Sequence, residues 1–163
     1  MPQKPTVYLE TTIPSYLASQ PSKDLVLAGE QLLTHEWWES RRSHFDLYAS
    51  ELVVDEASGG DPERAQKRLE LVSNLKFLLA DDSTKQLARA LIGSGLIPPK
   101  AAADATHIAI SSRYGIDFLL TWNCRHIANA QILKALSSVV EGNGYSLPVV
   151  CTPIELMGGG QDD

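Results

Sequence analysis

The chain has 163 residues, 44% of them hydrophobic, and a formal net charge of −6 at pH 7. This length and composition fit one globular domain with a sizeable core. The acidic balance argues against a protein that coats nucleic acid regardless of sequence, because Lys and Arg supply most of that affinity. It leaves room for a nucleic-acid enzyme, since a divalent cation held by acids reverses the local charge.

Cysteine usage and the absence of long apolar segments indicate a cytoplasmic protein. Cys124 and Cys151 are too few and too far apart for a disulfide framework or a zinc site. The N-terminal sequence "MPQKPT" lacks the apolar segment of an export signal, and no apolar stretch reaches membrane-spanning length. We therefore expect a reduced, cytoplasmic protein without membrane association.

Short β-rich runs alternate with longer stretches of helical periodicity. Strands are predicted at 6–9, 45–49, 76–80, 117–121 and 148–152, and helices roughly at 24–42, 51–58, 62–73, 83–92, 100–114 and 127–140. Such βα alternation predicts a single α/β domain, a three-layer α/β/α sandwich with a mostly parallel central sheet of four to five strands. The domain is predicted to span 1–157, and the final "GGGQDD" (158–163) to form a mobile tail.

An acid stands directly after the first predicted strand, in "TVYLETTIPSYL" (6–17). Parallel sheets place ligands beyond the carboxyl ends of their strands, so Glu10 is a candidate site residue. The alternative is a solvated loop acid or a local partner for the hydroxyl groups of Thr11 and Thr12. Thr12 equally suits the cap of a helix that contains Pro14.

The helix after the second strand carries the next candidate acid. Ser50 is a suitable N-cap for "ELVVDEAS", and a helical wheel turns Glu56 inward and Asp55 outward. The alternative for Glu56 is an acid at the rim of the apolar face with no functional role. For Asp55 we prefer a solvated position near the helix N-terminus.

A third acid lies in "KAAADATHIAIS" (100–111), a helix that is apolar on nearly every side. The pattern predicts that Asp104 is buried in the middle of this helix. A buried carboxylate must bind a metal, meet a cation or be protonated, which makes Asp104 the strongest candidate by this reasoning. His107, one turn later, is expected either to orient Asp104, to bind phosphate, or to be an ordinary hydrogen-bonded helix histidine.

The fourth strand ends in "LLTWNCRHIAN" (119–129). Asn123 occupies a strand-end position analogous to that of Glu10, and Arg125 and His126 follow it. These three residues are therefore candidate site residues, whereas Trp122 is expected to pack in the core.

The ordered set of Glu10, Glu56, Asp104 and Asn123, within "LETT", "SELVVDEASGGD", "KAAADATHIAIS" and "FLLTWNCRHIAN", resembles the PIN-domain proteins of the VapC toxin group over nearly the whole chain. The resemblance implies a ribonuclease that holds one or two Mg²⁺ or Mn²⁺ ions. Glu10, Glu56 and Asp104 become metal-site acids, Thr12 supports the first acid, and Asn123 is the last site position. It also implies a toxin–antitoxin pair, with a small antitoxin and a second copy of the chain as partners.

Two positions depart from the commonest family pattern. Glu10 stands where Asp is usual and reaches about 1.5 Å further. Asn123 stands where a carboxylate is usual, so it keeps an oxygen but loses a charge. Because Mg²⁺ prefers hard oxygen ligands and retains waters, an amide can replace a carboxylate that contacts the ion through water.

The chemistry that the resemblance implies needs no side-chain nucleophile, since a divalent cation activates water and stabilises charge on the phosphate. The main alternative is a catalytically silent PIN-like module that binds RNA or protein. A receiver-type phosphoacceptor ranks low, because its acidic pair follows the first strand, whereas Asp81 and Asp82 follow the third.

Adjacent tryptophans in "AGEQLLTHEWWESRR" (28–42) point about 100° apart on a helix, so Trp37 and Trp38 cannot both face one core. We expect one in the core and the other half-covered. The alternative is that the second Trp belongs to a protein interface, where exposed Trp is enriched.

Overall fold

A five-stranded sheet forms the centre of the computed structural model, which describes residues 3–158. The strands are β1 (Thr6–Leu9), β2 (Asp46–Ser50), β3 (Lys76–Leu78), β4 (Phe118–Leu120) and β5 (Val149–Cys151), in the order β3-β2-β1-β4-β5. Every pairing is parallel, which confirms the predicted α/β class and makes the described sheet wholly parallel rather than mostly so.

Among the described residues, six helices lie within a few residues of their predicted positions, and α1 (Thr12–Ala18) contains Pro14, where the sequence indicated a helix without bounds. The six are α2 (Leu25–Arg41), α3 (Glu51–Ala57), α4 (Pro62–Val72), α5 (Asp82–Gly93), α6 (Ala102–Arg113) and α7 (Ala130–Gly142), with 3₁₀ turns at Arg42–His44, Pro99–Ala101 and Pro153–Leu156. The largest shift is at the start of α7, where the side chain of Asn129 caps the helix by accepting from the amide of Gln131 at 3.0 Å.

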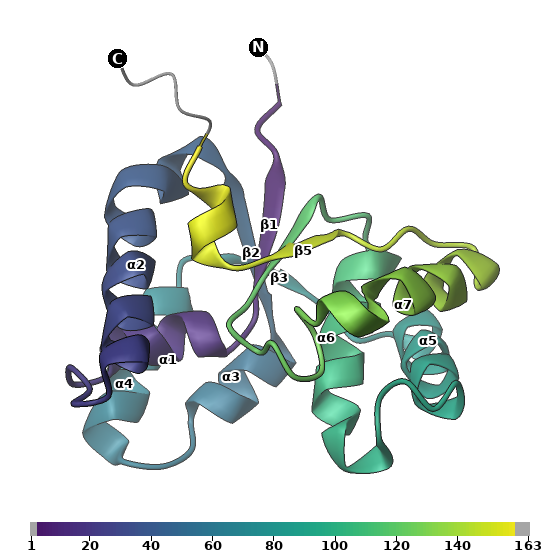
Figure 1. Ribbon diagram of the computed structural model, residues 1–163, viewed down its shortest axis with the longest axis horizontal. Helices are drawn as coiled ribbons and strands as arrows, with labels where there is room; N and C mark the ends of the chain where they lie inside the picture. The colour runs from purple at the N-terminus through teal and green to yellow at the C-terminus, as the bar shows by residue number, and fades with distance from the viewer. Residues whose placement is uncertain (1–2, 159–163) are drawn as a thin grey trace.

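Helices cover both faces of the sheet, so the molecule has the predicted three layers. Figure 1 shows α1, α2 and α4 on one side and α5, α6 and α7 on the other. Side chains alternate along β1: Tyr8 belongs to the apolar cluster under α5, α6 and α7, whereas Val7 and Leu9 belong to the cluster under α1 and α2. Leu119 and Leu120 of β4 divide between the two clusters in the same way.

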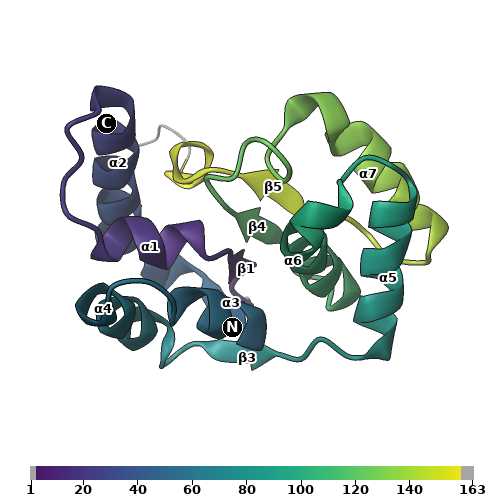
Figure 2. The same ribbon diagram turned by 90° about the horizontal axis from the view of Figure 1, so that it is seen from below.

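The strand order places the direction switch of the sheet between β1 and β4. The chain moves from β1 outward to β2 and β3, and then returns to pair β4 with the free side of β1. In open parallel sheets this point brings loops from different βα units together at the carboxyl edge. Figure 2 shows the molecule from below, toward the carboxyl edge of the sheet. β1 ends at this edge, and α1, α3 and α6 lie around it.

The predicted tail at 158–163 lies, apart from Gly158, outside the described residues. Within the described part, none of the helices combines the length and apolar character that crossing a membrane demands.

The two adjacent tryptophans occupy different environments, as the helical wheel predicts. Trp37 is completely buried, stacks on Phe45 and donates from Nε1 to the carbonyl of Leu156 at 3.1 Å. Trp38 is half-buried, with the guanidinium of Arg42 lying 4.9 Å from its ring centroid. Trp37 therefore joins α2 to the C-terminal 3₁₀ turn.

We expect Trp37→Ala to lower the free energy of unfolding by about 3–5 kcal/mol, because it opens a cavity and leaves the carbonyl of Leu156 without its partner. Trp38→Ala serves as the matched control and should cost much less, since this ring keeps contact with solvent. Urea unfolding of both variants measures the difference. Equal losses would contradict the assignment of Trp37 to the core.

Candidate functional site

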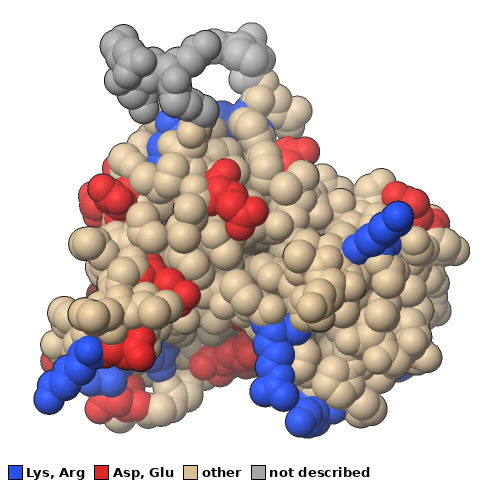
Figure 3. All heavy atoms as spheres, in the orientation of Figure 1, with Lys and Arg blue, Asp and Glu red and all other residues tan. Residues whose placement is uncertain are grey.

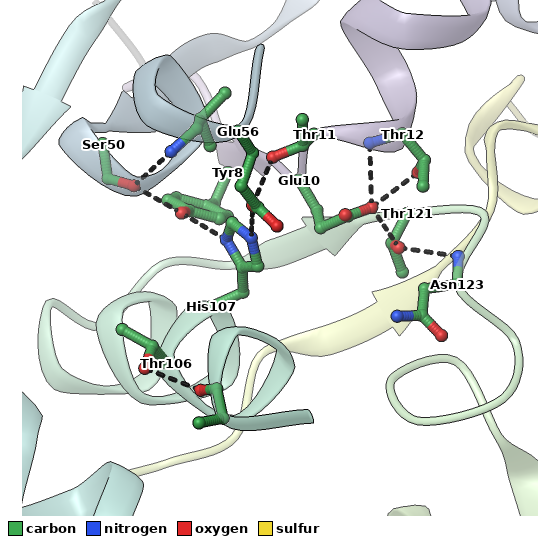
Figure 4. A network of polar contacts seen from close by, with 12 residues as sticks. Tyr8, Glu10, Thr11, Thr12, Ser50, Glu56, Thr106, His107, Thr121 and Asn123 are labelled. Atoms are coloured by element: carbon green, nitrogen blue, oxygen red, sulfur yellow. Dashed lines mark hydrogen bonds and ion pairs between the residues drawn. The ribbon is translucent and has the colours of Figure 1, made fainter. Parts of the chain in front are cut away.

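Glu10 follows β1 directly and is buried, with 4% of its surface exposed. Its Oε1 accepts three hydrogen bonds, from the hydroxyl of Thr12 at 2.5 Å, the amide of Thr12 at 3.1 Å and the hydroxyl of Thr121 at 2.7 Å. Figure 4 shows these contacts meeting at one oxygen. The end of β1, the start of α1 and the end of β4 are therefore joined through a single carboxyl oxygen.

Backbone amides fix the direction of these bonds. The hydroxyl of Thr12 accepts from the amide of Trp122, and that of Thr121 accepts from the amide of Asn123, both at 2.9 Å. Because an amide N–H only donates, each hydroxyl is left with its own hydrogen for Glu10. The Oε2 atom of Glu10 has no hydrogen bond to any residue between 3 and 158.

Glu56 projects from α3 beside Glu10, and its side chain is 34% exposed. Its Oε1 accepts from the hydroxyl of Thr11 at 2.7 Å and lies 2.5 Å from Nε2 of His107. Thr11 is the sequence neighbour of Glu10, so this bond sets the two acids side by side, as Figure 4 shows. Within the described chain, Oε2 of Glu56 also has no protein partner.

Two opposing effects act on the ionisation of Glu56. Burial raises the pKa of its carboxyl group, whereas the hydrogen bond with His107, the electrostatic attraction to that imidazole and the hydrogen bond from Thr11 lower it. The lowering effects prevail, and the pKa of Glu56 falls below its ordinary value. Glu56 is therefore a carboxylate at neutral pH.

Asp104 is less buried than its sequence context predicts. The expectation that it lies in the middle of a buried helix is wrong, because Pro99–Ala101 form a 3₁₀ turn and α6 starts only at Ala102. Asp104 thus sits in the first helical turn, with 20% of its side chain exposed. Its Oδ2 lies 3.0 Å from Nδ1 of His126.

His107 is completely buried and contacts Glu56 rather than Asp104. Its Nδ1 lies 2.8 Å from the hydroxyl of Tyr8, which in turn lies 2.7 Å from the hydroxyl of Ser50. The structure therefore gives His107 a hydrogen bond on each ring nitrogen. Its acidic partner is Glu56, whereas the sequence analysis considered Asp104 for this contact.

The loop after β4 is organised by Asn123. Its side-chain oxygen accepts from the amide of His126 at 3.0 Å, and Figure 4 shows its side-chain nitrogen pointing away from the loop. This bond holds His126 where it meets Asp104. Arg125, between them in sequence, is exposed, and its side chain forms no ion pair with residues 3–158.

Four residues of this network were not proposed as site residues from the sequence, namely Tyr8, Thr11, Ser50 and Thr121. Thr121 offers the clearest signal, because it stands at the end of a predicted strand that is parallel to the strand of Glu10. Ser50 was predicted only as the cap of α3, which it is, since its hydroxyl accepts from the amide of Val53 at 3.4 Å. Tyr8 reads in the sequence as an ordinary core residue.

A cavity of about 850 Å³ lies at the opposite edge of the sheet and is lined by residues that include Thr6, Tyr114 and Asp117. It does not include the three acids, and we place the candidate site by chemistry rather than by cavity size. In their present positions, the described residues contain no group of three His, Cys, Asp or Glu side chains that could together hold a metal ion.

Comparison with known proteins identifies the fold. No protein-family model matches the sequence, and a search of curated proteins gives no match. Among solved structures, the chain is similar to VapBC2 of Rickettsia felis bound to a promoter DNA fragment, with a TM-score of 0.57 and 15% identity over 90% of this chain and 98% of that one. It is also similar to VapC20 of Mycobacterium tuberculosis, a toxin described as cleaving the sarcin–ricin loop, with a TM-score of 0.53 and 14% identity over 74% of this chain and 92% of that one. The chain therefore has the PIN-like fold of VapC toxins.

The lowered pKa of Glu56 predicts a pH dependence of stability. A carboxyl group whose pKa is lower in the folded than in the unfolded state stabilises the fold above its ordinary pKa, here 4.5, and this stabilisation is lost as the pH falls through the folded value. In metal-free buffer, Glu56→Gln should therefore lose less stability than the parent between about pH 5 and pH 3. Urea unfolding at a series of pH values measures this. If the free energy of unfolding of the parent and of Glu56→Gln falls equally with pH, the pKa of Glu56 is not lowered in the folded state.

Proposed function

We propose that this chain is a divalent-metal-dependent ribonuclease of the PIN type and the toxin of a toxin–antitoxin pair. The observation that carries the proposal is shared by Glu10, Glu56 and Asp104. Each acid has one oxygen held by protein partners and a second oxygen without a hydrogen bond to the described residues. Three acids from three βα units, each held in this way, suit the binding of a cation.

The donor set fits Mg²⁺ or Mn²⁺. Carboxylate oxygens are hard ligands, and these ions prefer hard oxygen and retain several waters, so they need only a few protein ligands. The residues that would hold the ion are Glu10, Glu56 and Asp104. Because no cluster of three ligands is already assembled among residues 3–158, these side chains would adjust on binding.

Each acid has a distinct role in this proposal. Glu10, fixed by Thr12 and Thr121, provides a rigid ligand at the end of β1. Glu56 and Asp104 approach from α3 and α6, and their greater exposure leaves them accessible to RNA. When bound, the cation supplies positive charge that activates water and offsets charge on the phosphate.

The charge distribution supports a cation-dependent approach of RNA. The chain carries a net charge of −6, and the face shown in Figure 3 has separated acidic and basic side chains rather than a continuous basic field. Attraction of a phosphate near three acids therefore requires a cation. The exposed Arg125, in the loop that also holds His126, is a basic candidate for a direct phosphate contact.

The structural relatives support the biological assignment. VapC20 is described as a toxin that cleaves an RNA loop, which favours RNA as the substrate. VapBC2 was solved bound to promoter DNA, which favours a small antitoxin as partner. We extend both properties to this chain, together with a second copy of itself as partner, as part of the proposal.

A catalytically silent module is the second candidate, and Asn123 favours it. This residue has no charge, and its side-chain oxygen is already used by the amide of His126. A PIN-like protein with a weakened ion site would retain its fold and bind RNA or protein without cleaving. Metal titration separates the two functions.

Asp104→Asn tests the proposed reaction. The variant should lose RNA cleavage by roughly 100-fold or more in Mn²⁺, because it removes a charge from the ion site. In EDTA its free energy of unfolding should stay within about 1 kcal/mol of the parent, since partly exposed ion pairs contribute little. Asp55→Asn, an exposed acid on α3, is the control and should cleave normally. Full activity of Asp104→Asn would contradict the proposal.

Asn123→Asp tests the loop after β4. Aspartate keeps an oxygen for the amide of His126. The side-chain nitrogen, which points away from the loop, is replaced by a second oxygen, and the group gains a negative charge. We expect Mn²⁺ binding to tighten by about 1 kcal/mol if the added charge acts at ~4 Å through solvent. Asn129→Asp adds the same charge at the cap of α7 and serves as control. Titration calorimetry compares them, and equal effects would place position 123 away from the ion.

A further inference from the structure

A chain of buried hydrogen bonds runs under the candidate site to Glu56. It links Ser50, at the start of α3, to Tyr8 of β1 and to His107 of α6. The three side chains come from separate elements, and their exposed fractions are 1%, 0% and 0%. Figure 4 shows the chain ending at the carboxylate of Glu56. No step of the proposed reaction uses Tyr8 or His107 directly.

The hydrogen atoms of this chain have one arrangement that satisfies every group. The hydroxyl of Ser50 accepts from the amide of Val53, so its own hydrogen is available for the hydroxyl of Tyr8. Tyr8 then donates to Nδ1 of His107, which leaves the ring hydrogen on Nε2. If Nδ1 donated instead, the buried hydroxyl of Ser50 would have no acceptor among the described residues.

The far end of the chain meets one oxygen of Glu56 only. Nε2–H of His107 and the hydroxyl of Thr11 both donate to Oε1, from opposite sides of the site in α6 and in the turn after β1. Two donors from different elements fix both the position and the rotation of a carboxylate better than one donor does. The oxygen that remains, Oε2, is the one available to a ligand.

We propose that His107 is a positioning residue: held by Tyr8 and Ser50, it donates to Oε1 of Glu56 and thereby presents Oε2 to the bound cation. The inference rests on the proposed metal-dependent function and adds to it a buried residue that does not touch the ion. Partners of this kind orient metal-binding side chains in many proteins.

The first experiment needs no metal and no activity. Nitrogen-15 NMR of the metal-free protein at neutral pH reports which ring nitrogen of His107 carries hydrogen. We expect hydrogen on Nε2, the atom that faces Glu56, and none on Nδ1, which accepts from Tyr8. A ring protonated only on Nδ1 would overturn the proposal, because it could not donate to Glu56.

The second experiment compares the affinity for Mn²⁺ of four variants by titration calorimetry. His107→Leu removes the donor and should weaken binding by roughly 10- to 100-fold. His107→Gln places an amide N–H near the position of Nε2 and should restore most of the affinity. Tyr8→Phe removes the hydroxyl that orients the ring and should weaken binding less than His107→Leu does.

Ser111→Ala is the matched control in the same helix. Its side chain is completely buried, and among residues 3–158 its hydroxyl bonds to the carbonyls of His107 and Ile108 alone. This variant should bind Mn²⁺ like the parent even if its stability falls. Unfolding measurements on all four variants separate a loss of fold from a loss of positioning.

The outcomes distinguish the two proposals. If the parent binds Mn²⁺ and both His107 variants bind it equally well, His107 has only a structural role and the inference fails. If both lose affinity without rescue by Gln, the donor to Glu56 is not what matters, and the inference also fails. If the parent binds no Mn²⁺, the metal-dependent function fails, whereas the NMR result still decides whether His107 donates to Glu56.

Discussion

A buried carboxyl group at the end of the central strand is the constraint on which the candidate site depends. Glu10 is 4% exposed, and a carboxyl group in such a place is stable only when protein donors satisfy it. The donors are hydroxyls at the start of α1 and at the end of β4, and both are oriented by backbone amides of the loop after β4. The pairing of β1 with β4 brings the hydroxyl of Thr121 within reach of Glu10, whereas Thr12 follows Glu10 in the same turn.

The number of hydrogen bonds to the carboxyl group decreases from Glu10, which accepts three, to Glu56 and then to Asp104. Glu56 has two donors on one oxygen and Asp104 has one contact, with His126, and both side chains remain partly exposed. Such a gradient suits a site with one rigid ligand and two that adjust as an ion binds. It also explains how Glu10 and Glu56 can lie side by side, because hydrogen-bond donors offset part of their repulsion.

Much of this arrangement could be predicted from the sequence. The alternation of strands and helices gives a parallel sheet, and the rule that ligands lie beyond its carboxyl edge singles out Glu10; the helical wheel turns Glu56 toward it. Periodicity shows which face a side chain occupies but not which partner it meets, so the bonds of His107 to Glu56 and Tyr8 were not foreseen. The burial of Asp104 was overestimated, because the wheel ignores the 3₁₀ turn that delays the start of α6. The bonds of Thr11 to Glu56 and of Thr121 to Glu10 join separate elements, so the sequence does not define these pairs, although the strand-end position of Thr121 indicates that it lies at the same edge as Glu10.

The most direct test of the central claim is the anomalous scattering of a crystal of this protein soaked in Mn²⁺. The account predicts a peak bound by Oε2 of Glu10 and Oε2 of Glu56, with Oδ1 of Asp104 turned toward it and both Oε1 atoms still held by their protein donors. Absence of a peak at saturating Mn²⁺, or a peak bound elsewhere while these oxygens stay free, would contradict it.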